Sequence, residues 1–214
     1  MRLVLISDTH GQHERLEIPD GDVLIHAGDL TTHGQISELP AFNDFLRGLP
    51  HRHKLVVAGN HDFCFEEQPQ ACAEILNQAI YLQDEAVTLD GVRYYGSPWQ
   101  PRFFDWAFNL DRGAPLRAKW DLIPPDTDVL ITHGPPWGHG DLNSEGERVG
   151  CRDLWEVVQR VRPRLHIFGH IHEGYGLTRT ALITFANASN CNLRYRPVNP
   201  PLVFDYPRSG STAP

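Results

Sequence analysis

The sequence predicts an α/β protein that contains two β-sheets, one of them interleaved with helices. Short runs rich in valine, isoleucine and leucine alternate with amphipathic segments along much of the chain. That alternation is typical of buried strands connected by helices. Other stretches contain strand-like runs with no helix between them, and these indicate a second sheet that is richer in hairpins.

Five short apolar runs are the expected buried strands. Each is almost continuously apolar, as suits a strand that is covered on both faces. Each is also bounded by glycine, aspartate, asparagine or histidine, which marks its end. The runs are LVLI (3–6), VLIHA (23–27), LVVA (55–58), VLIT (129–132) and LHIF (165–168).

Amphipathic segments between these runs are the expected helices, and Pro163 stops the last of them. They are residues 36–46, 70–78, 116–120 and 152–161. The stretch from 80 to 96 has strand-like runs on both sides of Asp90-Gly91, a dipeptide that favours a two-residue hairpin. Further strand-like runs occupy 176–189 and 202–206.

Length and composition predict one globular domain over residues 1–207 and a disordered tail at 208–214. The chain has 214 residues, of which 41% are hydrophobic, enough to bury a full core. Its formal net charge of -8, without a basic block, argues against long nucleic acid as a partner. The pattern leaves the oligomeric state open.

The apolar runs are all shorter than the ~20 residues of a membrane-spanning helix, and the first is too short for a secretory signal. We therefore expect a cytoplasmic protein with no membrane partner. Reduced cysteines that serve packing fit this expectation, because the four show neither paired nor zinc-finger spacing. They are Cys64, Cys72, Cys151 and Cys191.

Side chains of the kinds that bind metal ions follow all five buried strands. A metal site in a sheet protein collects its ligands from several strand ends, so these residues are candidates for one shared site. They are Asp8 and His10, then Asp29, then Asn60 and His61, then His133, and finally His170 and His172.

The mixture of carboxylate, amide and imidazole groups predicts a centre with two divalent ions. Two ions about 3.5–4 Å apart need a bridging carboxylate and open positions for hydroxide and substrate. The absence of cysteine from the set disfavours a closed structural zinc site. Manganese, iron, nickel, zinc and magnesium all accept such ligands, and we favour manganese or iron.

These motifs together resemble those of the calcineurin-like metallophosphoesterases. The order DxH, GD, GNHD, HG and GHxH is that of the family. The longer strings THGPPWG, RVGC, RPRLHIFGHIHEGYG, FANAS and NPPLVFDYP are similar to the metallophosphoesterase-domain-containing (MPPED-type) phosphodiesterases, and the resemblance extends over residues 1–207. It implies a four-layer αββα fold and a metal-dependent phosphoric diester hydrolase.

The resemblance also assigns roles to the motif residues. It implies that Asp29 bridges the two ions and that His61 is not a ligand but contacts phosphate and protonates the leaving oxygen. Some MPPED-type members carry glycine in place of the first histidine of GHxH, but this chain has His170, which implies binding of both ions. The implied ligands are Asp8, His10 and His172 for one ion, and Asn60, His133 and His170 for the other.

A dense aromatic segment at residues 94–113 is the candidate substrate-binding element. Rigid aromatic rings near a phosphoesterase centre suit a nucleobase, which proteins bind largely by stacking. The alternative is a hydrophobic flap that packs on the second sheet. The candidate contacts are Trp99, Phe103, Trp106 and Arg102.

The predicted function is hydrolysis of small phosphodiesters, with cyclic nucleotides converted to nucleoside monophosphates. One alternative is phosphodiester or phosphomonoester hydrolysis without base preference, and another is a nucleotide-binding module with little turnover. A folded phosphoprotein is not an expected substrate. The GDxVDRG block of the protein serine/threonine phosphatases is absent, since the sequence here reads GDLTTHG.

Overall fold

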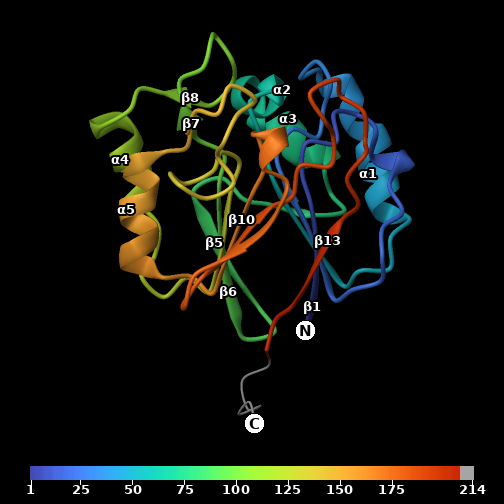
Figure 1. The fold of residues 1–214 in the computed structure, drawn as a ribbon. Coiled ribbons are helices and arrows are strands. Elements are labelled where there is room, and N and C mark those ends of the chain that lie inside the picture. The colour runs from blue at the N-terminus through green and yellow to red at the C-terminus, as the bar shows by residue number, and fades with distance from the viewer. Residues whose placement is uncertain (208–214) are drawn as a thin grey trace.

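The computed structural model describes residues 1–207 and contains two mixed β-sheets packed face to face, with helices on both outer sides (Figure 1). This confirms the predicted α/β sandwich. The predicted tail at 208–214 lies outside the described residues.

The first sheet has the strand order β13-β1-β2-β3-β4. Its four strands from the first part of the chain are parallel, and β13 from the end of the chain runs antiparallel to β1. The strands are β1 (Arg2–Ile6), β2 (Val23–Ala27), β3 (His53–Val57), β4 (Ile80–Tyr81) and β13 (Leu202–Asp205).

The second sheet has the order β11-β12-β10-β9-β6-β5, with four parallel strands between two antiparallel edges. Asp90 and Gly91, both with positive φ, form the predicted hairpin turn between β5 and β6. The strands are β5 (Glu85–Leu89), β6 (Val92–Ser97), β9 (Val129–Thr132), β10 (Leu165–Phe168), β11 (Gly176–Arg179) and β12 (Thr184–Asn187).

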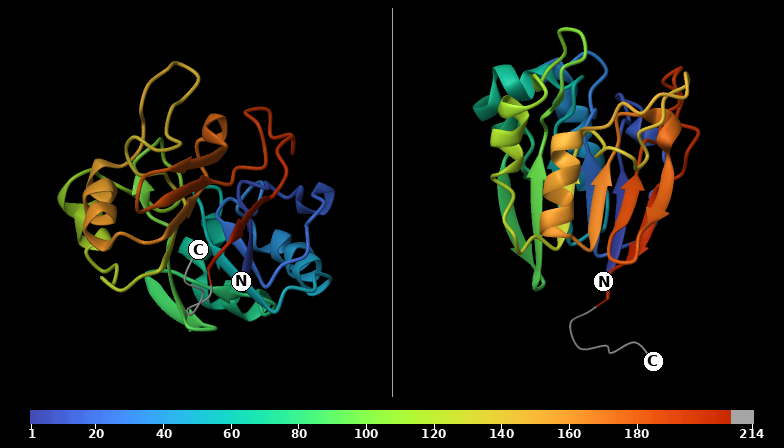
Figure 2. Two further views of the ribbon diagram at one scale, coloured as in Figure 1. Left: turned by 60° about the horizontal axis from the view of Figure 1, so that its bottom comes forward. Right: turned by 60° about the vertical axis from the view of Figure 1, so that its left-hand side comes forward.

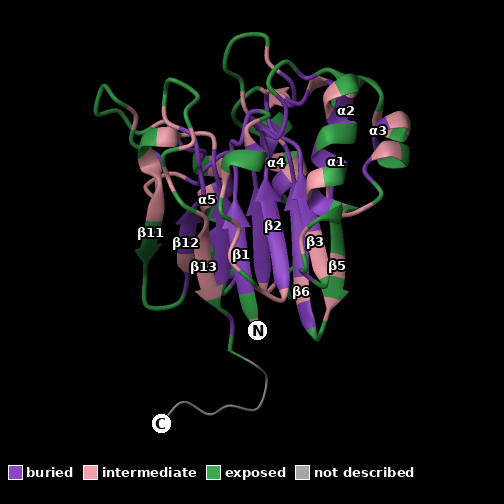
Figure 3. Ribbon diagram, turned by 90° about the vertical axis from the view of Figure 1, so that its right-hand side faces the viewer, coloured by how far each residue is buried: buried purple, intermediate pink, exposed green. Residues whose placement is uncertain are grey.

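Helices cover the outer face of each sheet and complete four layers (Figure 2). Because side chains alternate along a strand, Leu3 and Leu5 of β1 enter the core between the sheets, whereas Val4 and Ile6 pack under the helices. The helices are α1 (Leu39–Arg47), α2 (Phe63–Glu67) and α3 (Pro69–Ile75) on the first sheet, and α4 (Ala114–Trp120) and α5 (Arg152–Val161) on the second. The central strands are accordingly the most buried part of the molecule, whereas the edge strands β5, β11 and β13 are partly exposed (Figure 3).

Two of the expected helices differ from the structure at one end. The helix expected at 36–46 starts as a 3-10 turn, and the helix expected at 70–78 ends at Ile75. Several short elements were not predicted from the sequence. Helix α2 has only five residues and no apolar period, so its helical form depends on packing of Cys64 and Phe65. The others are η1 (His13–Arg15), η2 (Ile36–Glu38), η3 (His172–Gly174), β7 (Gln100–Pro101) and β8 (Asn109–Leu110).

The parallel strands of both sheets point their carboxyl ends toward the same pole, at the top in Figure 1. The start of β1 and the end of β13 lie at the opposite pole, where the Met1 amino group donates a hydrogen bond to the Tyr206 carbonyl at 2.9 Å. All four cysteines are buried and free, as expected for packing residues. Among residues 1–207, no helix has the length and apolar character needed to cross a membrane.

Candidate metal centre

The loops that follow β1, β2, β3, β9 and β10 meet at the upper pole and bring the predicted ligands together. The loop after β1 lies directly on the loop after β2, with the Asp8 amide bonded to the Gly28 carbonyl and the His10 amide to the Asp29 carbonyl. A bridge between Ser7 and Ser189 ties the two sheets at the same level. The carboxyl ends of both sheets therefore form one surface.

Asp8, His10 and His172 form one group. The His172 Nε2 atom lies 3.3 Å from Asp8 Oδ1 and 3.4 Å from His10 Nε2. All three residues offer ligand atoms within 4.8 Å of one another, a spacing at which they could hold one metal ion. The carboxylate and two imidazoles suit a first-row divalent ion.

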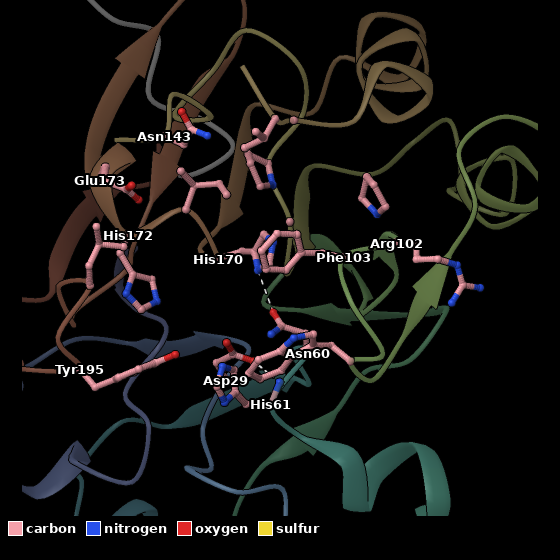
Figure 4. Close-up of a pocket in the computed structure, with 18 of the residues that line it drawn as sticks. Asp29, Asn60, His61, Arg102, Phe103, Asn143, His170, His172, Glu173 and Tyr195 are labelled. Atoms are coloured by element: carbon pink, nitrogen blue, oxygen red, sulfur yellow. Dashed lines mark hydrogen bonds between the residues drawn. The ribbon is translucent and has the colours of Figure 1, made fainter. Parts of the chain in front are cut away.

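Asn60, His133 and His170 form a second group. The Asn60 Oδ1 atom lies 2.9 Å from His133 Nε2 and 2.7 Å from His170 Nδ1, the second of these contacts being drawn in Figure 4. One oxygen and two ring nitrogens therefore converge on a common point. These are the three residues that the sequence resemblance assigns to a second ion.

Asp29 lies between the two groups. Its Oδ2 atom is 3.8 Å from His10 Nε2 in the first group, and its Oδ1 atom is 3.5 Å from His133 Nε2 in the second. Each carboxylate oxygen therefore faces a different group, which is the arrangement that a bridging ligand requires. Residues 1–207 thus bring all seven predicted ligands into one cluster.

Hydrogen bonds outside the cluster orient its rings. The His133 Nδ1 atom donates to the Ala27 carbonyl at 2.9 Å, and the His172 Nδ1 atom donates to the Asn192 carbonyl at 3.1 Å. Both rings are thereby left with Nε2 facing the cluster, as is usual for histidine ligands. Ser189 Oγ donates to Asp8 Oδ2 at 2.8 Å and fixes that carboxylate.

Backbone strain concentrates at the same residues. Asp8, His10, Asp29 and His170 have φ values of 52°, 43°, 57° and 67°, in the left-handed region that costs a non-glycine residue about 1–3 kcal/mol when the surroundings must enforce it. This geometry turns each side chain inward where its strand ends. Such strain is found mainly at functional sites, and here it marks four of the predicted ligands.

The glycines of the motifs provide space for the ligands. A Cβ atom on Gly59 would lie 2.3 Å from Asp29 Oδ1, and one on Gly169 would lie 2.0 Å from Asp8 Oδ2. Real contacts of this kind are never so short, so any other residue would displace a carboxylate. The glycine in GNHD and the first glycine in GHIH are therefore required by the close approach of neighbouring loops.

The electrostatics of the cluster favour cations. Asp8 and Asp29 are almost completely buried, and among the described residues neither pairs with a lysine or arginine. Burial alone would lower the pKa of His133 and of His172, yet the two carboxylates raise each pKa to about 9. A buried site that attracts protons this strongly fits divalent ions, which would supply the missing positive charge.

His61 lies at the edge of the cluster, beside both Asp29 and Trp106. Its amide donates to Asp29 Oδ1 at 2.7 Å, and its Nδ1 atom is 3.3 Å from the Thr32 carbonyl. Its Nε2 atom has no hydrogen-bond partner within residues 1–207. The His61 ring also packs on Trp106 with centroids 4.1 Å apart. Because His61 can also converge with His10 and Asp29 on a metal, its non-ligand role stays a prediction.

A cavity of about 380 Å³ opens directly over the cluster. Asp29, Asn60, His61, His170 and His172 form its inner wall (Figure 4). Its outer wall contains the aromatic, polar and apolar side chains of the surrounding loops. These include Arg102, Phe103, Trp106, Arg112, Asn143, Glu173, Leu193 and Tyr195.

The structure brings three of the four predicted substrate contacts to this cavity. Trp106 packs on His61, and Phe103 stands 53% exposed at the mouth. Arg102 also lines the cavity, but its Nε atom pairs with Asp111 Oδ1 at 2.7 Å and its guanidinium points away from the cluster (Figure 4).

Trp99 does not line the cavity, contrary to the expectation from its sequence position. Its indole nitrogen donates to Asp84 Oδ2 at 2.9 Å, and its ring packs edge-on against Phe108 and under the Lys119 ammonium group. Trp99 is partly buried and packs against the apolar clusters under the helices of both sheets. This position agrees with the alternative of a hydrophobic flap, although Trp99 contacts the clusters of both sheets and not of the second alone.

Tyr195 is the main residue of the site that sequence reasoning missed. Its ring lies 4.6 Å from the His10 ring and 5.8 Å from the His61 ring, measured between centroids. It comes from the long loop before β13, which contains no motif of ligand-type residues. In the sequence, Tyr195 is distinguished only as an aromatic residue between two arginines in a loop with few aromatic residues.

Similarity to a known family and to known proteins agrees with this geometry. The profile described as Calcineurin-like phosphoesterase matches residues 1–174. The chain is 47% identical to metallophosphoesterase domain-containing protein 1 of Homo sapiens, over 96% of this chain and 71% of that protein. It is 42% identical to a UPF0046 protein of Caenorhabditis elegans, over 97% of this chain and 60% of that protein.

Solved structures share the fold at low sequence identity. The crystal structure of TT1561 of Thermus thermophilus superposes with a TM-score of 0.61 at 14% identity, over 87% of this chain and 88% of that chain. The profile match implies a phosphoester hydrolase that uses divalent metal ions, and the buried Asp and His groups suit such ions. The chain belongs to the calcineurin-like phosphoesterase family.

Proposed function

We propose that this protein is a dinuclear metal-dependent phosphodiesterase that hydrolyses small phosphodiesters, with cyclic nucleotides as its substrates. The observation that carries the proposal is the position of Asp29, with one carboxylate oxygen toward each of two ligand groups. The cavity above these groups is of a size that suits a small molecule.

In this proposal, each group of ligands would hold one divalent ion, and Asp29 would serve both. When bound, the two ions supply positive charge for the phosphoryl oxygens and an activated nucleophile for in-line attack. His61 holds a proton at Nε2 and delivers it to the departing alkoxide. Its available Nε2 atom supports this role, and the hydrogen bond from its backbone amide to Asp29 holds the residue at the edge of the cavity.

The mouth of the cavity supports a substrate with a base. Phe103 and Phe104 expose 53% and 72% of their surface, although large apolar side chains usually pack inside. Asn109 holds both in place, because its side-chain nitrogen donates to the Phe103 and Phe104 carbonyls and its side-chain oxygen accepts from the Phe103 amide. A fixed, exposed ring beside a phosphate site offers a stacking surface for a nucleobase.

Two alternatives keep the same metal centre. Hydrolysis without base preference would leave the exposed phenylalanines without a role, and a binding module with little turnover would have no need of the complete ligand set.

The experiment is a hydrolysis panel on protein that has been stripped with a chelator and reloaded with manganese, iron, nickel, zinc or magnesium. The substrates are 2′,3′- and 3′,5′-cyclic nucleotides, bis-nitrophenyl phosphate and nitrophenyl phosphate.

We expect metal-dependent turnover, two ions per chain, and higher kcat/KM for cyclic nucleotides than for nitrophenyl phosphate. Equal rates on all three substrate classes would favour the enzyme without base preference. Nucleotide binding that is independent of metal and leads to no product would favour the binding module.

A further inference from the structure

Tyr195 occupies a position above the metal centre that the proposed reaction does not yet use. It lies in the loop between β12 and β13 and has a φ of 54°, in the left-handed region. In Figure 4 its side chain extends from this loop toward Asp29 and His61, with the hydroxyl oxygen at the inner end. Tyr195 also forms part of the cavity wall.

A turn centred on Asn192 holds Tyr195 in this position. The Asn192 carbonyl accepts hydrogen bonds from the Tyr195 amide at 2.8 Å and from His172 Nδ1 at 3.1 Å. The Asn192 side-chain oxygen accepts from the amides of Arg194 and Arg196 and closes the turn. Gln12, from the loop after β1, donates to the Tyr195 carbonyl. The same residue that orients a predicted metal ligand therefore also orients Tyr195.

The ring of Tyr195 is held among three histidines of the site. Its centroid lies 4.6 Å from that of His10, 5.8 Å from that of His61 and 6.0 Å from that of His172, each at an interplanar angle of 69° or more. The three histidine rings limit the positions of the Tyr195 ring, although the residue is 45% exposed. Restriction of this kind preorganises a hydroxyl group for a ligand.

The hydroxyl of Tyr195 has no hydrogen-bond partner among the described residues, unlike the hydroxyls of Tyr81, Tyr175 and Tyr206. A phenol is protonated at neutral pH and can donate one hydrogen bond. The groups nearest to this donor in the cavity are ligands for cations, so the complementary partner is an anion that those cations bind. A phosphoryl group is such an anion.

We propose that the Tyr195 hydroxyl donates a hydrogen bond to a non-bridging phosphoryl oxygen of the substrate. This inference rests on the proposed function and adds a substrate-contacting residue to it. The bond would orient the phosphoryl group for attack and stabilise the charge that grows on that oxygen. It would not touch the leaving group, and this separates the role of Tyr195 from that of His61.

The test is the substitution Tyr195→Phe, which removes the hydroxyl and keeps the ring. We expect kcat/KM to fall about 10- to 100-fold, the range for loss of one hydrogen bond to a charged oxygen. The loss should be the same for esters of good and of poor leaving groups. Metal content and melting temperature should stay unchanged. The matched control is Tyr175→Phe, because the Tyr175 hydroxyl already donates to the Pro200 carbonyl outside the cavity.

Inorganic phosphate provides a second readout that needs no turnover. Its affinity for metal-loaded protein, measured by calorimetry, should fall in Tyr195→Phe and not in Tyr175→Phe. If wild type hydrolyses no phosphodiester but the phosphate affinity falls as expected, the proposed function is wrong and the Tyr195 contact stands. Unchanged phosphate affinity and unchanged kcat/KM in Tyr195→Phe would overturn the inference. So would loss of bound metal, or a loss of rate that depends on the leaving group.

Discussion

At the scale of single residues, the clearest prediction concerns Asp29. Because each of its oxygens faces a different ligand group, Asp29→Ala should lower the metal content to less than two ions per chain and remove nearly all turnover. The fold should persist, since the side chain stabilises the loops mainly by one bond to the His61 amide. Metal analysis, turnover and circular dichroism measure the three effects.

The control for this substitution is Asp44→Ala, which removes an exposed carboxylate on α1. Two tightly bound ions and near-normal turnover in Asp29→Ala would show that another residue bridges the ions.

His61 should affect chemistry more than metal binding. His61→Ala is expected to keep both ions and to lose on the order of 10²-fold in turnover, which is typical for loss of a general acid. The loss should be smaller for nitrophenyl esters, because nitrophenolate departs without a proton. The comparison needs steady-state rates on esters that differ only in the leaving group, with His33→Ala as a control on a neighbouring exposed histidine.

An equal loss on all these esters would instead indicate that His61 positions the phosphate. Fewer ions in His61→Ala would make it a ligand, as its convergence with His10 and Asp29 allows.

The clustering of the candidate ligands could be predicted from sequence because short polar motifs follow recognisable strands. Asp8, Asn60 and His133 all stand just beyond apolar runs, and parallel strands place such residues at one edge. Tyr195 could not be predicted, because its position depends on a turn that folds back across the site to reach Gln12, far away in the sequence. The prediction that Trp99 contacts substrate was wrong for a related reason. A high density of aromatic residues in a segment does not show which of the rings packs into the core.

At the scale of elements, the segment from β7 to β8 acts as a rigid support for Phe103. Strands β7 and β8 pair in parallel, and the three hydrogen bonds of Asn109 close the loop between them. Sequence reasoning identified this segment as aromatic but not as a supported loop, because two-residue strands leave no periodic pattern. The five buried apolar runs, by contrast, were predicted to within about two residues at each end.

This support leads to a prediction about base recognition. Phe103→Ala should lower kcat/KM for a cyclic nucleotide by roughly 5- to 150-fold, the range for loss of one stacking contact. Asn109→Ala should act in the same direction, because it frees the loop that positions the Phe103 ring, although the ring itself is retained. A ribose cyclic phosphate without a base should be hydrolysed equally well by wild type and both variants.

If the abasic substrate suffers the same loss as the nucleotide, Phe103 supports the cavity and does not bind the base. The melting temperature of Phe103→Ala should remain that of wild type, since the ring is more exposed than buried.

At the scale of the whole molecule, one buried histidine in each sheet makes the fold sensitive to acid. The Nε2 atoms of His26 and His166 lie 2.9 Å from the hydroxyls of Thr9 and Thr132, and burial lowers the pKa of each histidine to about 3. In the unfolded chain both would take up a proton near pH 6.5. Stability is therefore complete above that pH and is lost as the pH falls from about 6.5 toward 3.

His166→Gln should remove one of these contributions. Between pH 7 and pH 5, the metal-free variant should lose about 2 kcal/mol less unfolding free energy than metal-free wild type, the amount for one proton bound only by the unfolded chain. Urea unfolding at several pH values measures the difference. A parallel pH dependence for the two proteins would mean that His166 has the same pKa in the folded and the unfolded chain.

The hydrogen bonds between Met1 and Tyr206 make the protein suitable for circular permutation. Because the two backbones are hydrogen-bonded at the pole opposite the cavity, a short linker can join these positions without crossing the site. New ends can then be opened at the exposed turn between β11 and β12, where Leu182 is 63% exposed. Such a circular permutant would begin with β12 and end with β11, and it would keep every loop of the metal centre in place.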